Sequence, residues 1–299
     1  MGIGISIVIP TYGRSQQLQA CLQALTHLDY PRDAFDVIVV DDGSDTPPDS
    51  AIGPFRERLD LTLLAQEHAG PAAARNAGAA RAKGRFLAFT DDDCSPDRLW
   101  LQILAAHFAL NPDRALGGRT INALPRNLYS CASQDLVSYL YAYYNANHDQ
   151  ARFFASNNLA LPADSFRHIG GFDETFPFAA GEDRDLCDRW VSCGYPMAYV
   201  PEAIVRHAHP LSIRSFWRQQ FNYGRGAYYF HKKRGRRSQT PPVNVVALEP
   251  RAFYLNLLFY PLAQARSLNA KALAAFLAVL SQAAIAAGFG WESRKRSHG

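Results

Sequence analysis

The sequence predicts an α/β protein whose mostly parallel sheet is flanked by helices, and three observations support this fold class. Short apolar runs rich in β-branched residues alternate with helical patterns through the first 110 residues, as in doubly wound sheets. The chain has 299 residues, 48% hydrophobic and 19% charged, which allows a buried core and argues against a disordered chain. Polar residues follow three of the apolar runs, where parallel strands end and ligands bind in such sheets.

The first part of the chain carries the clearest elements. Ser15 can cap a helix that runs to about Leu25, and a second helix begins at Pro71 and ends at Gly84. Four buried strands are expected, at residues 3–10, 35–40, 61–65 and 85–90.

The pattern is less regular after residue 111. We expect an aromatic-rich helix around 138–145, a strand at 153–161, and a helix that opens within 181–190. Residues 195–209 resemble one or two strands that end at histidines. An amphipathic helix is expected at 212–230.

The tail holds two apolar stretches, 254–263 and 272–290. The second has 19 residues without a charge, close to the minimum for spanning a bilayer, but it is rich in alanine. A helix in or on a membrane and a helix packed on the domain are equally compatible with it. Basic clusters flank these stretches and suggest contact with an anionic membrane, although a solvated basic loop explains the first equally well: Lys232, Lys233, Arg234, Arg236, Arg237 and Arg294, Lys295, Arg296.

Composition also bounds the partners and the compartment. The net charge of +4 is too small to indicate a nucleic-acid partner. The cysteines are odd in number and scattered, which predicts reduced thiols: Cys21, Cys94, Cys131, Cys187 and Cys193. No charged region precedes the first apolar run, so no signal peptide is expected, and the predicted location is the cytoplasm or the cytoplasmic face of a membrane.

Three loops are expected to meet at one edge of the sheet. Thr11-Tyr12 follows the first strand, Asp41-Asp42 the second, and Asp91-Asp92-Asp93 the fourth. Three adjacent carboxylates repel one another unless a cation or water neutralises them. Mg²⁺ and Mn²⁺ commonly join carboxylates to phosphate oxygens, so the triplet predicts a site for a diphosphate and its metal. The alternative is an exposed acidic turn or a helix N-cap.

Further candidates are weaker by themselves. Arg75 can pair with a nucleotide or form a structural salt bridge. Glu182-Asp183 opens a helix, where a carboxylate can serve as a general base or only stabilise the helix end. His207 and His209 could ligate a metal or bind phosphate, or be ordinary surface residues.

Motifs of other enzyme classes are absent. The sequence has no GxxxxGK[ST] loop and no GxGxxG after the first strand, which argues against a P-loop ATPase and a dinucleotide dehydrogenase. It also lacks GxSxG, the nucleophile elbow of α/β-hydrolases.

Six segments in order resemble the family 2 glycosyltransferases of GT-A fold. They cover about residues 3–210: IVIPTYGR (7–14), VIVVDDGSD (37–45), AGPAAARNAGAARAKG (69–84), FLAFTDDDCSP (86–96), GGFDETF (170–176) and GEDRDLCDRW (181–190). The chain departs at Gly13, where the family often has asparagine. It also lacks the QxxRW motif of the processive synthases, so a non-processive enzyme that adds one sugar is expected.

The resemblance implies a role for each matching residue. Asp183 would be the general base, and Asp91 and Asp93 would bind Mg²⁺ or Mn²⁺ with His207, for which His209 competes. The nucleotide-sugar diphosphate, most simply a UDP-sugar, would contact Pro10, Thr11, Tyr12, Asp41 or Asp42, Arg75 and Asp92.

The resemblance also implies a division of the chain and a reaction. Residues 1–210 would form the GT-A domain, with a nucleotide half (1–110) and an acceptor half (111–210), and residues 211–299 a helical extension that can contact a membrane. The reaction would be inverting transfer of one sugar to a hydroxyl of a glycan or lipid-linked acceptor in cell-envelope or polysaccharide assembly. The alternatives are a catalytically silent membrane scaffold and a sugar nucleotidyltransferase.

Overall fold

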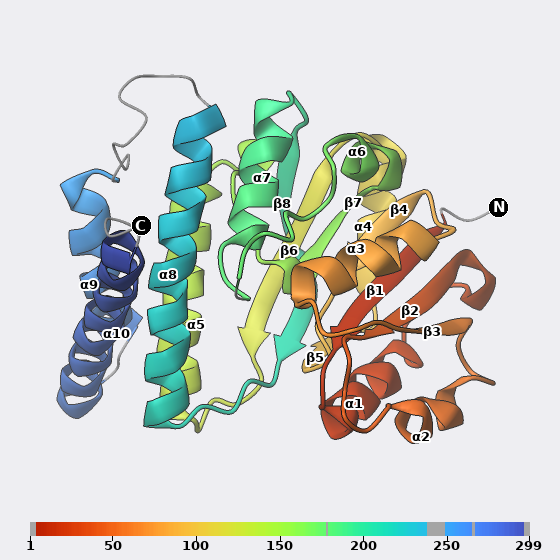
Figure 1. The fold of residues 1–299 in the computed structure, drawn as a ribbon, viewed down its shortest axis with the longest axis horizontal. Coiled ribbons are helices and arrows are strands. Elements are labelled where there is room, and N and C mark those ends of the chain that lie inside the picture. The colour runs from red at the N-terminus through yellow and green to blue at the C-terminus, as the bar shows by residue number, and fades with distance from the viewer. Residues whose placement is uncertain (1–3, 178, 238–248, 265–266, 296–299) are drawn as a thin grey trace.

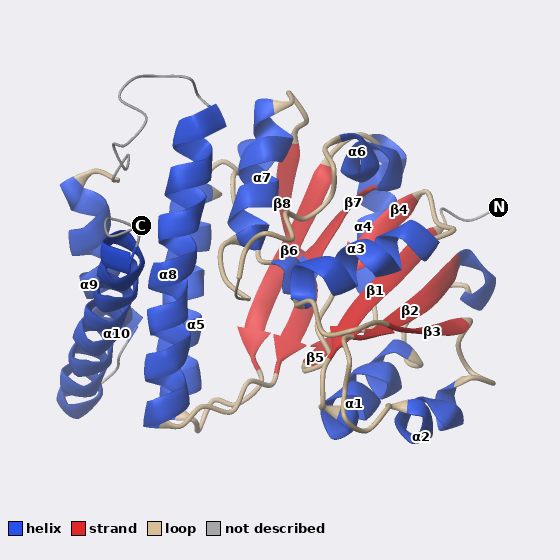
Figure 2. Ribbon diagram, viewed as in Figure 1, coloured by secondary structure: helices blue, strands red, loops and turns tan. Residues whose placement is uncertain are grey.

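The computed structural model describes residues 4–177, 179–237, 249–264 and 267–295. One eight-stranded sheet runs through the molecule in the order β3-β2-β1-β4-β7-β6-β8-β5, with helices packed on it. A group of long helices stands beside the β6–β8 side of the sheet, away from β3 (Figure 1). Figure 2 separates the strands from the helices in the same view.

The first half of the sheet is parallel, as predicted. It consists of β1 (Ile5–Thr11), β2 (Phe35–Asp41), β3 (Leu61–Ala65) and β4 (Phe86–Phe89). Every residue of β1, β2 and β4 is buried because helices cover both faces, which explains their mostly apolar sequences; the polar Ser6 and Asp36 hydrogen-bond to each other. The register pairs Thr11 with Asp41, so the two strands end at the same level.

The second half of the sheet is mixed. Its strands are β5 (Cys94–Pro96), β6 (Ala115–Asn122), β7 (Leu159–Pro162) and β8 (Met197–His207). β7 is antiparallel to β4 and to β6, whereas β6 and β8 are parallel. The strand predicted at 153–161 is wrong before Leu159, since Ser156–Asn158 form a 3₁₀ turn. The buried Asn158 side chain holds this turn by donating to the carbonyl oxygen of Ala203 and accepting from Trp100 Nε1.

Among the described residues, six helices flank the sheet. They are α1 (Ser15–Leu25), α2 (Asp49–Ile52), α3 (Pro71–Arg81), α4 (Trp100–Leu110), α6 (Ala163–His168) and α7 (Glu182–Ser192). The predicted cap at Ser15 is wrong, because Ser15 is the first helical residue and the capping position falls on Arg14. Gly181 precedes α7 with φ of 94°, and an added Cβ there would lie 2.9 Å from the Gly226 carbonyl oxygen. Glycine thus lets α7 begin close against the next long helix.

Four longer helices form the group beside the sheet: α5 (Leu128–Tyr144), α8 (Ile213–Arg237), α9 (Arg251–Gln264) and α10 (Leu268–Lys295). α5 belongs to this group although it precedes residue 210; its Tyr139 packs on Phe253 of α9 and donates a hydrogen bond to the Phe253 carbonyl oxygen at 2.7 Å. The predicted division between residues 210 and 211 falls in the segment between β8 and α8, and it stays a prediction.

α10 packs closely on α8. A Cβ at Gly224 would overlap the Ile285 carbonyl oxygen, and one at Gly288 would overlap that of Phe221. Buried polar contacts add to this: Ser281 donates to Gln220 at 2.8 Å, and Glu292 accepts from Arg225 at 2.6 Å. α10 therefore docks on the rest of the protein through one face.

The other face of α10 is exposed and apolar. Within the described residues, Leu268–Lys295 alone is long and apolar enough to cross a membrane by length and composition, with a mean hydropathy of 2.0 over 18 residues, of which 22% are buried. The helix is thus packed on the protein along one side, and the open question of membrane contact concerns its other side.

Candidate active site

The three predicted loops meet at one edge of the sheet. Thr11 Oγ1 donates a hydrogen bond to Asp92 at 2.8 Å, and the register of β1 and β2 brings Asp41 beside Thr11. Pro10, Thr11, Tyr12, Asp42 and the acidic triplet all line one cleft, whose cavity volume is about 1030 Å³. The convergence predicted from the strand ends is confirmed.

Asp41 and Asp42 differ in what they reach. Asp41 turns back to accept hydrogen bonds from the amide and hydroxyl of Ser44. Asp42 lines the cleft and accepts from the amides of Ala69 and Gly70, each at 2.9 Å. Of the two, Asp42 is the better placed to meet a ligand.

Tyr12 and His68 form a stacked aromatic pair beside Asp42. Their ring centroids are 4.4 Å apart, Tyr12 is 49% exposed, and both residues line the cleft. His68 Nδ1 lies 2.9 Å from the Asp42 carboxylate. His68 was not among the predicted site residues, although its position after the end of β3, at the same sheet edge, indicates a site residue.

The three aspartates of the triplet point to different partners. Asp91 accepts from Arg75 at 2.7 Å, and Asp92 accepts from Thr11 and Arg14. Asp92 is 3% exposed, and burial raises its pKa to about 7 while Arg14 opposes the rise. Asp92 thus supports the loop internally, and its predicted ligand contact stays a prediction.

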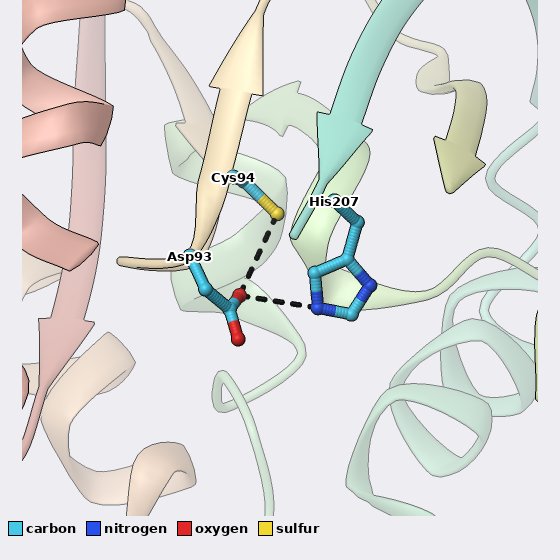
Figure 3. Close-up of side chains that lie close together, drawn as sticks. All are labelled: Asp93, Cys94 and His207. Carbon is cyan, nitrogen blue, oxygen red and sulfur yellow. Dashed lines mark hydrogen bonds and ion pairs between the residues drawn. The ribbon is translucent and has the colours of Figure 1, made fainter. Parts of the chain in front are cut away.

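Asp93 faces His207 (Figure 3), and His209 also lies near its carboxylate. Its carboxylate lies 3.1 Å from His207 Nε2 and 3.4 Å from His209 Nδ1. Burial by itself would raise the pKa of Asp93, but hydrogen bonds with His207 and His209 hold it well below its usual range. Burial would likewise lower the pKa of His207, yet the Asp93 carboxylate raises it. Asp93 is therefore anionic at neutral pH and available to a cation.

The only group of potential metal ligands found among the described residues is Asp93, Cys94 and His207, whose ligand atoms lie within 4.8 Å of one another. Strand pairing of β5 with β8 sets Cys94 opposite His207. Burial raises the pKa of the Cys94 thiol well above its usual value, so it stays protonated and is a poor ligand. Asp91 is not in this group because its carboxylate pairs with Arg75. The predicted pairing of Asp91 with Asp93 on one ion stays a prediction.

Arg14 was not among the predicted site residues. Its Nη1 donates to Asp92 at 3.1 Å and to Asp93 at 2.8 Å, and its side chain is 46% exposed. The guanidinium offsets the negative charge of the triplet. The sequence did indicate this residue. Arg14 ends the IVIPTYGR segment, next to the loop that is expected to lie beside the three carboxylates.

Arg75 connects the triplet to the start of α7. It is 4% exposed and reaches both Asp91 and Glu182, the latter at 3.3 Å. This geometry is the structural salt bridge that the sequence left as one of two alternatives. Arg75 Nε and Glu182 Oε2 are buried and have no hydrogen-bond partner within the described residues, so the pair keeps some unused polar capacity at the cleft.

Asp183 lines the cleft at the first turn of α7 and accepts from the amide of Arg184 at 2.7 Å. Burial raises its pKa, with that hydrogen bond and Arg75 opposing. Burial also raises the pKa of the adjacent Glu182, to about 7. A carboxylate with a raised pKa is a stronger base than an exposed aspartate, as proton abstraction requires.

Comparison with known proteins decides the family. A sequence model described as glycosyl transferase family 2 matches residues 6–170, more than half of the chain. The chain is a family 2 glycosyltransferase. A second model, described as the N-terminal domain of galactosyltransferase, matches residues 138–211 of this glycosyltransferase.

Curated relatives of this glycosyltransferase agree. A pre-mycofactocin glycosyltransferase from Mycobacterium tuberculosis is 32% identical over 237 residues, which is 75% of this chain and 46% of that protein. Validoxylamine A glucosyltransferase from Streptomyces hygroscopicus is 31% identical, covering 67% of this chain and 54% of that protein. The chain thus spans about half the length of these two relatives.

Solved structures confirm the GT-A fold of this glycosyltransferase. A mannosyltransferase from Pyrobaculum calidifontis, in complex with GDP-Man and Mn²⁺, superposes with a TM-score of 0.67 at 21% identity, covering 98% of this chain and 88% of that one. GalNAc-T7 with UDP, GalNAc and Mn²⁺ gives a TM-score of 0.57 at 16% identity, covering 85% of this chain and 54% of that one.

Proposed function

We propose that the protein transfers one sugar from a nucleotide-diphosphate sugar to a hydroxyl acceptor with inversion at the anomeric carbon. The observation that carries this proposal is that Asp42, Asp93, His207 and Asp183 line one cleft. A nucleotide-binding end, an anionic carboxylate beside two imidazoles, and the half-buried Asp183 carboxylate with a raised pKa are thus available to one substrate pair.

The reaction follows from these positions. The nucleotide lies at the Tyr12–Asp42 end, and its diphosphate lies toward Asp93. Asp183 takes the proton of the acceptor hydroxyl as the oxygen attacks the anomeric carbon. The bond from that carbon to the diphosphate oxygen breaks on the opposite face, which inverts the configuration. Arg75 keeps Asp91 and Glu182 in place beside this step.

The residues around Asp93 fit a divalent cation. An anionic carboxylate oxygen suits Mg²⁺ and Mn²⁺, and the neighbouring imidazole nitrogens are more compatible with Mn²⁺. Once bound, such a cation offsets the negative charge that builds on the leaving diphosphate.

The donor and the competing functions are separated by one screen. Purified protein is incubated with UDP-, GDP- and dTDP-sugars and Mn²⁺, and the released products are identified. We expect one class of donor, most simply a UDP-sugar, to release its nucleoside diphosphate. A sugar nucleotidyltransferase would instead release pyrophosphate in a parallel incubation with a nucleoside triphosphate and a sugar 1-phosphate. A protein that binds no nucleotide with Mn²⁺ in a melting assay would be a silent scaffold.

We infer that the protein works at the cytoplasmic face of a membrane, in envelope or polysaccharide assembly. The five free cysteines support a reducing compartment. The outer faces of α9 and α10 expose large apolar side chains, and cations stand at both ends of α10: Leu255, Phe259, Phe276, Val279, Trp291 and Lys271, Arg294, Lys295. Arg296 of the predicted basic cluster lies outside the described residues.

The other basic cluster has a different role. It lies on the last turns of α8 rather than in a loop, and Arg234 and Arg237 pair with Asp188 of α7. Lys233 pairs with Asp173. Membrane contact is therefore assigned to α9 and α10.

Vesicle flotation tests the membrane assignment. Full-length protein should float with vesicles that contain phosphatidylglycerol and less with pure phosphatidylcholine, because anionic lipid attracts the flanking cations. Phe276→Glu should reduce flotation by adding a charge to the exposed apolar face. Protein that stays at the bottom of the gradient with both vesicle types would contradict the assignment.

A further inference from the structure

The cleft continues beyond Asp183 into the space between the long helices. The same cavity is lined by Leu136 and Leu140 of α5, Leu257 and Leu258 of α9, and Ile285 and Phe289 of α10. We call this part the apolar arm. Arg184, which follows the proposed base Asp183, contacts α5 and α8, so the start of α7 lies next to these helices and we assign the arm to the acceptor.

Arg184 marks the entrance to the apolar arm. It follows Asp183 directly, donates to the Tyr144 hydroxyl of α5 at 2.6 Å, and lies 4.6 Å from the ring centroid of Phe230 in α8. An acceptor whose hydroxyl is at Asp183 therefore has its next atoms at this entrance.

The charged groups at the entrance of the arm pair with each other, and Gln282 of α10 adds a polar side chain to the cavity lining. Arg184 lies 3.5 Å from Glu249, which also accepts from the Tyr144 hydroxyl at 2.7 Å. Burial lowers the pKa of His231 to about 4, so this lining side chain is neutral at neutral pH. Among the described residues, the charged side chains at the entrance of the apolar arm are Arg184 and Glu249, and they form an ion pair.

This lining suits an aliphatic chain better than a sugar. A buried sugar hydroxyl needs a hydrogen-bond partner, and leucine and isoleucine offer none. An aliphatic chain instead gains free energy in proportion to the apolar area that it buries. The outer faces of α9 and α10 are apolar as well, at Leu255, Phe259 and Phe276, which matches a ligand that comes from a bilayer.

We propose that the apolar arm binds the aliphatic chain of a lipid-linked hydroxyl acceptor. The arm then orients the acceptor so that its hydroxyl meets Asp183. The proposal rests on the proposed function for the identity of the acceptor, but chain binding itself needs neither donor nor transfer.

Chain binding is measured directly on the full-length protein. The probe is dansyl-undecanoic acid, displaced by n-alkyl glucosides of increasing chain length below their critical micelle concentrations. Affinity should rise by about fourfold per added methylene until the arm is filled. Affinity that does not depend on chain length would overturn the proposal.

Two adjacent alanines of α10 give a matched pair of variants. Ala286 and Ala287 are both exposed, but only Ala286 lines the cavity. Ala286→Trp should weaken the long-chain glucosides by about tenfold or more, since an indole displaces several methylenes from the arm. Ala287→Trp should leave their affinity unchanged. Thermal unfolding midpoints check that both variants are folded.

The outcomes separate this proposal from the proposed function. Equal effects of the two variants would place the chains on the outer face of α10 and overturn the arm. If the protein binds UDP with Mn²⁺ but binds no alkyl chains, the proposed function stands and the proposal for the apolar arm is wrong. If Ala286→Trp but not Ala287→Trp weakens chain binding and the protein binds no nucleotide, the proposal for the apolar arm stands and the proposed function is wrong.

Discussion

Asp183→Asn is expected to lower kcat by about a thousandfold, because a positioned general base contributes typically 10²–10⁴ to the rate. Asparagine keeps the size and hydrogen-bonding geometry of the side chain but cannot accept the acceptor proton. Donor affinity should change little, since Asp183 lies at the start of α7, whereas Asp93 directly precedes β5 and His207 ends β8. The measurements are kcat by product release and nucleotide affinity by titration.

Asp188→Asn is the matched control. Asp188 belongs to the same helix, but it pairs with Arg234 and Arg237 rather than lining the cleft. It should retain wild-type kcat within about threefold, as surface substitutions usually do. If Asp183→Asn kept a tenth or more of wild-type kcat, the base would have to be another group.

The pH dependence of the activity is a second test of Asp183 as the general base. Burial raises its pKa above the ordinary 3.8, and the base works only when deprotonated. Activity should therefore fall as the pH decreases through this raised pKa, so the acid limb lies at higher pH than for an exposed aspartate. Glu182, with a pKa of about 7, titrates beside it, so the limb reports the pair. In the residual activity of Asp183→Asn, the part of this limb that belongs to Asp183 should be lost, and the part that remains belongs to Glu182.

The parallel half of the fold was predictable because its strands are buried on both faces. Each of β1, β2 and β4 is a mostly apolar run, interrupted by Ser6 in β1 and Asp36 in β2, and turn residues mark its end. The same regular pattern predicted that the strand-end aspartates lie at one edge of the sheet.

The second half was less predictable because its order depends on contacts between distant residues. β7 is four residues long and pairs with β4 and β6, which come from separate parts of the chain. The 3₁₀ turn before β7 is held by the side chain of Asn158, which donates a hydrogen bond to the distant carbonyl oxygen of Ala203, and not by a local propensity. Such a long-range hydrogen bond leaves no periodic trace in the sequence.

The candidate active site was likewise predictable only in part. Sequence placed Asp91, Asp92 and Asp93 together but could not tell which way each carboxylate turns. Those directions depend on Arg75, Arg14 and His207, which arrive from α3, the β1–α1 loop and β8. The apolar arm was also beyond prediction, since it is enclosed by helices that are up to about 150 residues apart in the chain, such as α5 and α10.

Asp93→Ala is expected to abolish Mn²⁺-dependent nucleotide binding and to lower kcat/KM by about a thousandfold or more. The reason is that Asp93 is the anionic member of the candidate metal group and is held deprotonated by its contacts with His207 and His209. Losing the cation removes several kcal/mol of stabilisation from the developing charge on the leaving group. Titration of UDP with and without Mn²⁺ measures the binding, and chelation of the wild type by EDTA should reproduce the loss of activity.

The two histidines can be ranked by the same titration. His207 Nε2 is the nearer to Asp93, at 3.1 Å against 3.4 Å for His209 Nδ1, and His209 also contacts Gln219. We therefore expect His207→Ala to weaken Mn²⁺-dependent binding more than His209→Ala does. The reverse order would assign the metal contact to His209.

Two controls test whether the effect belongs to the metal ligands themselves. Cys94→Ala should keep Mn²⁺-dependent binding, because the buried thiol stays protonated and is a poor ligand. Arg14→Gln should also keep it, and should strengthen it if the guanidinium competes with the cation for the Asp93 carboxylate. If Asp93→Ala bound UDP with an unchanged response to Mn²⁺ while Cys94→Ala lost that response, the metal would have to be held by a different set of atoms, and the role of Asp93 would reduce to its ion pairs with Arg14 and the histidines.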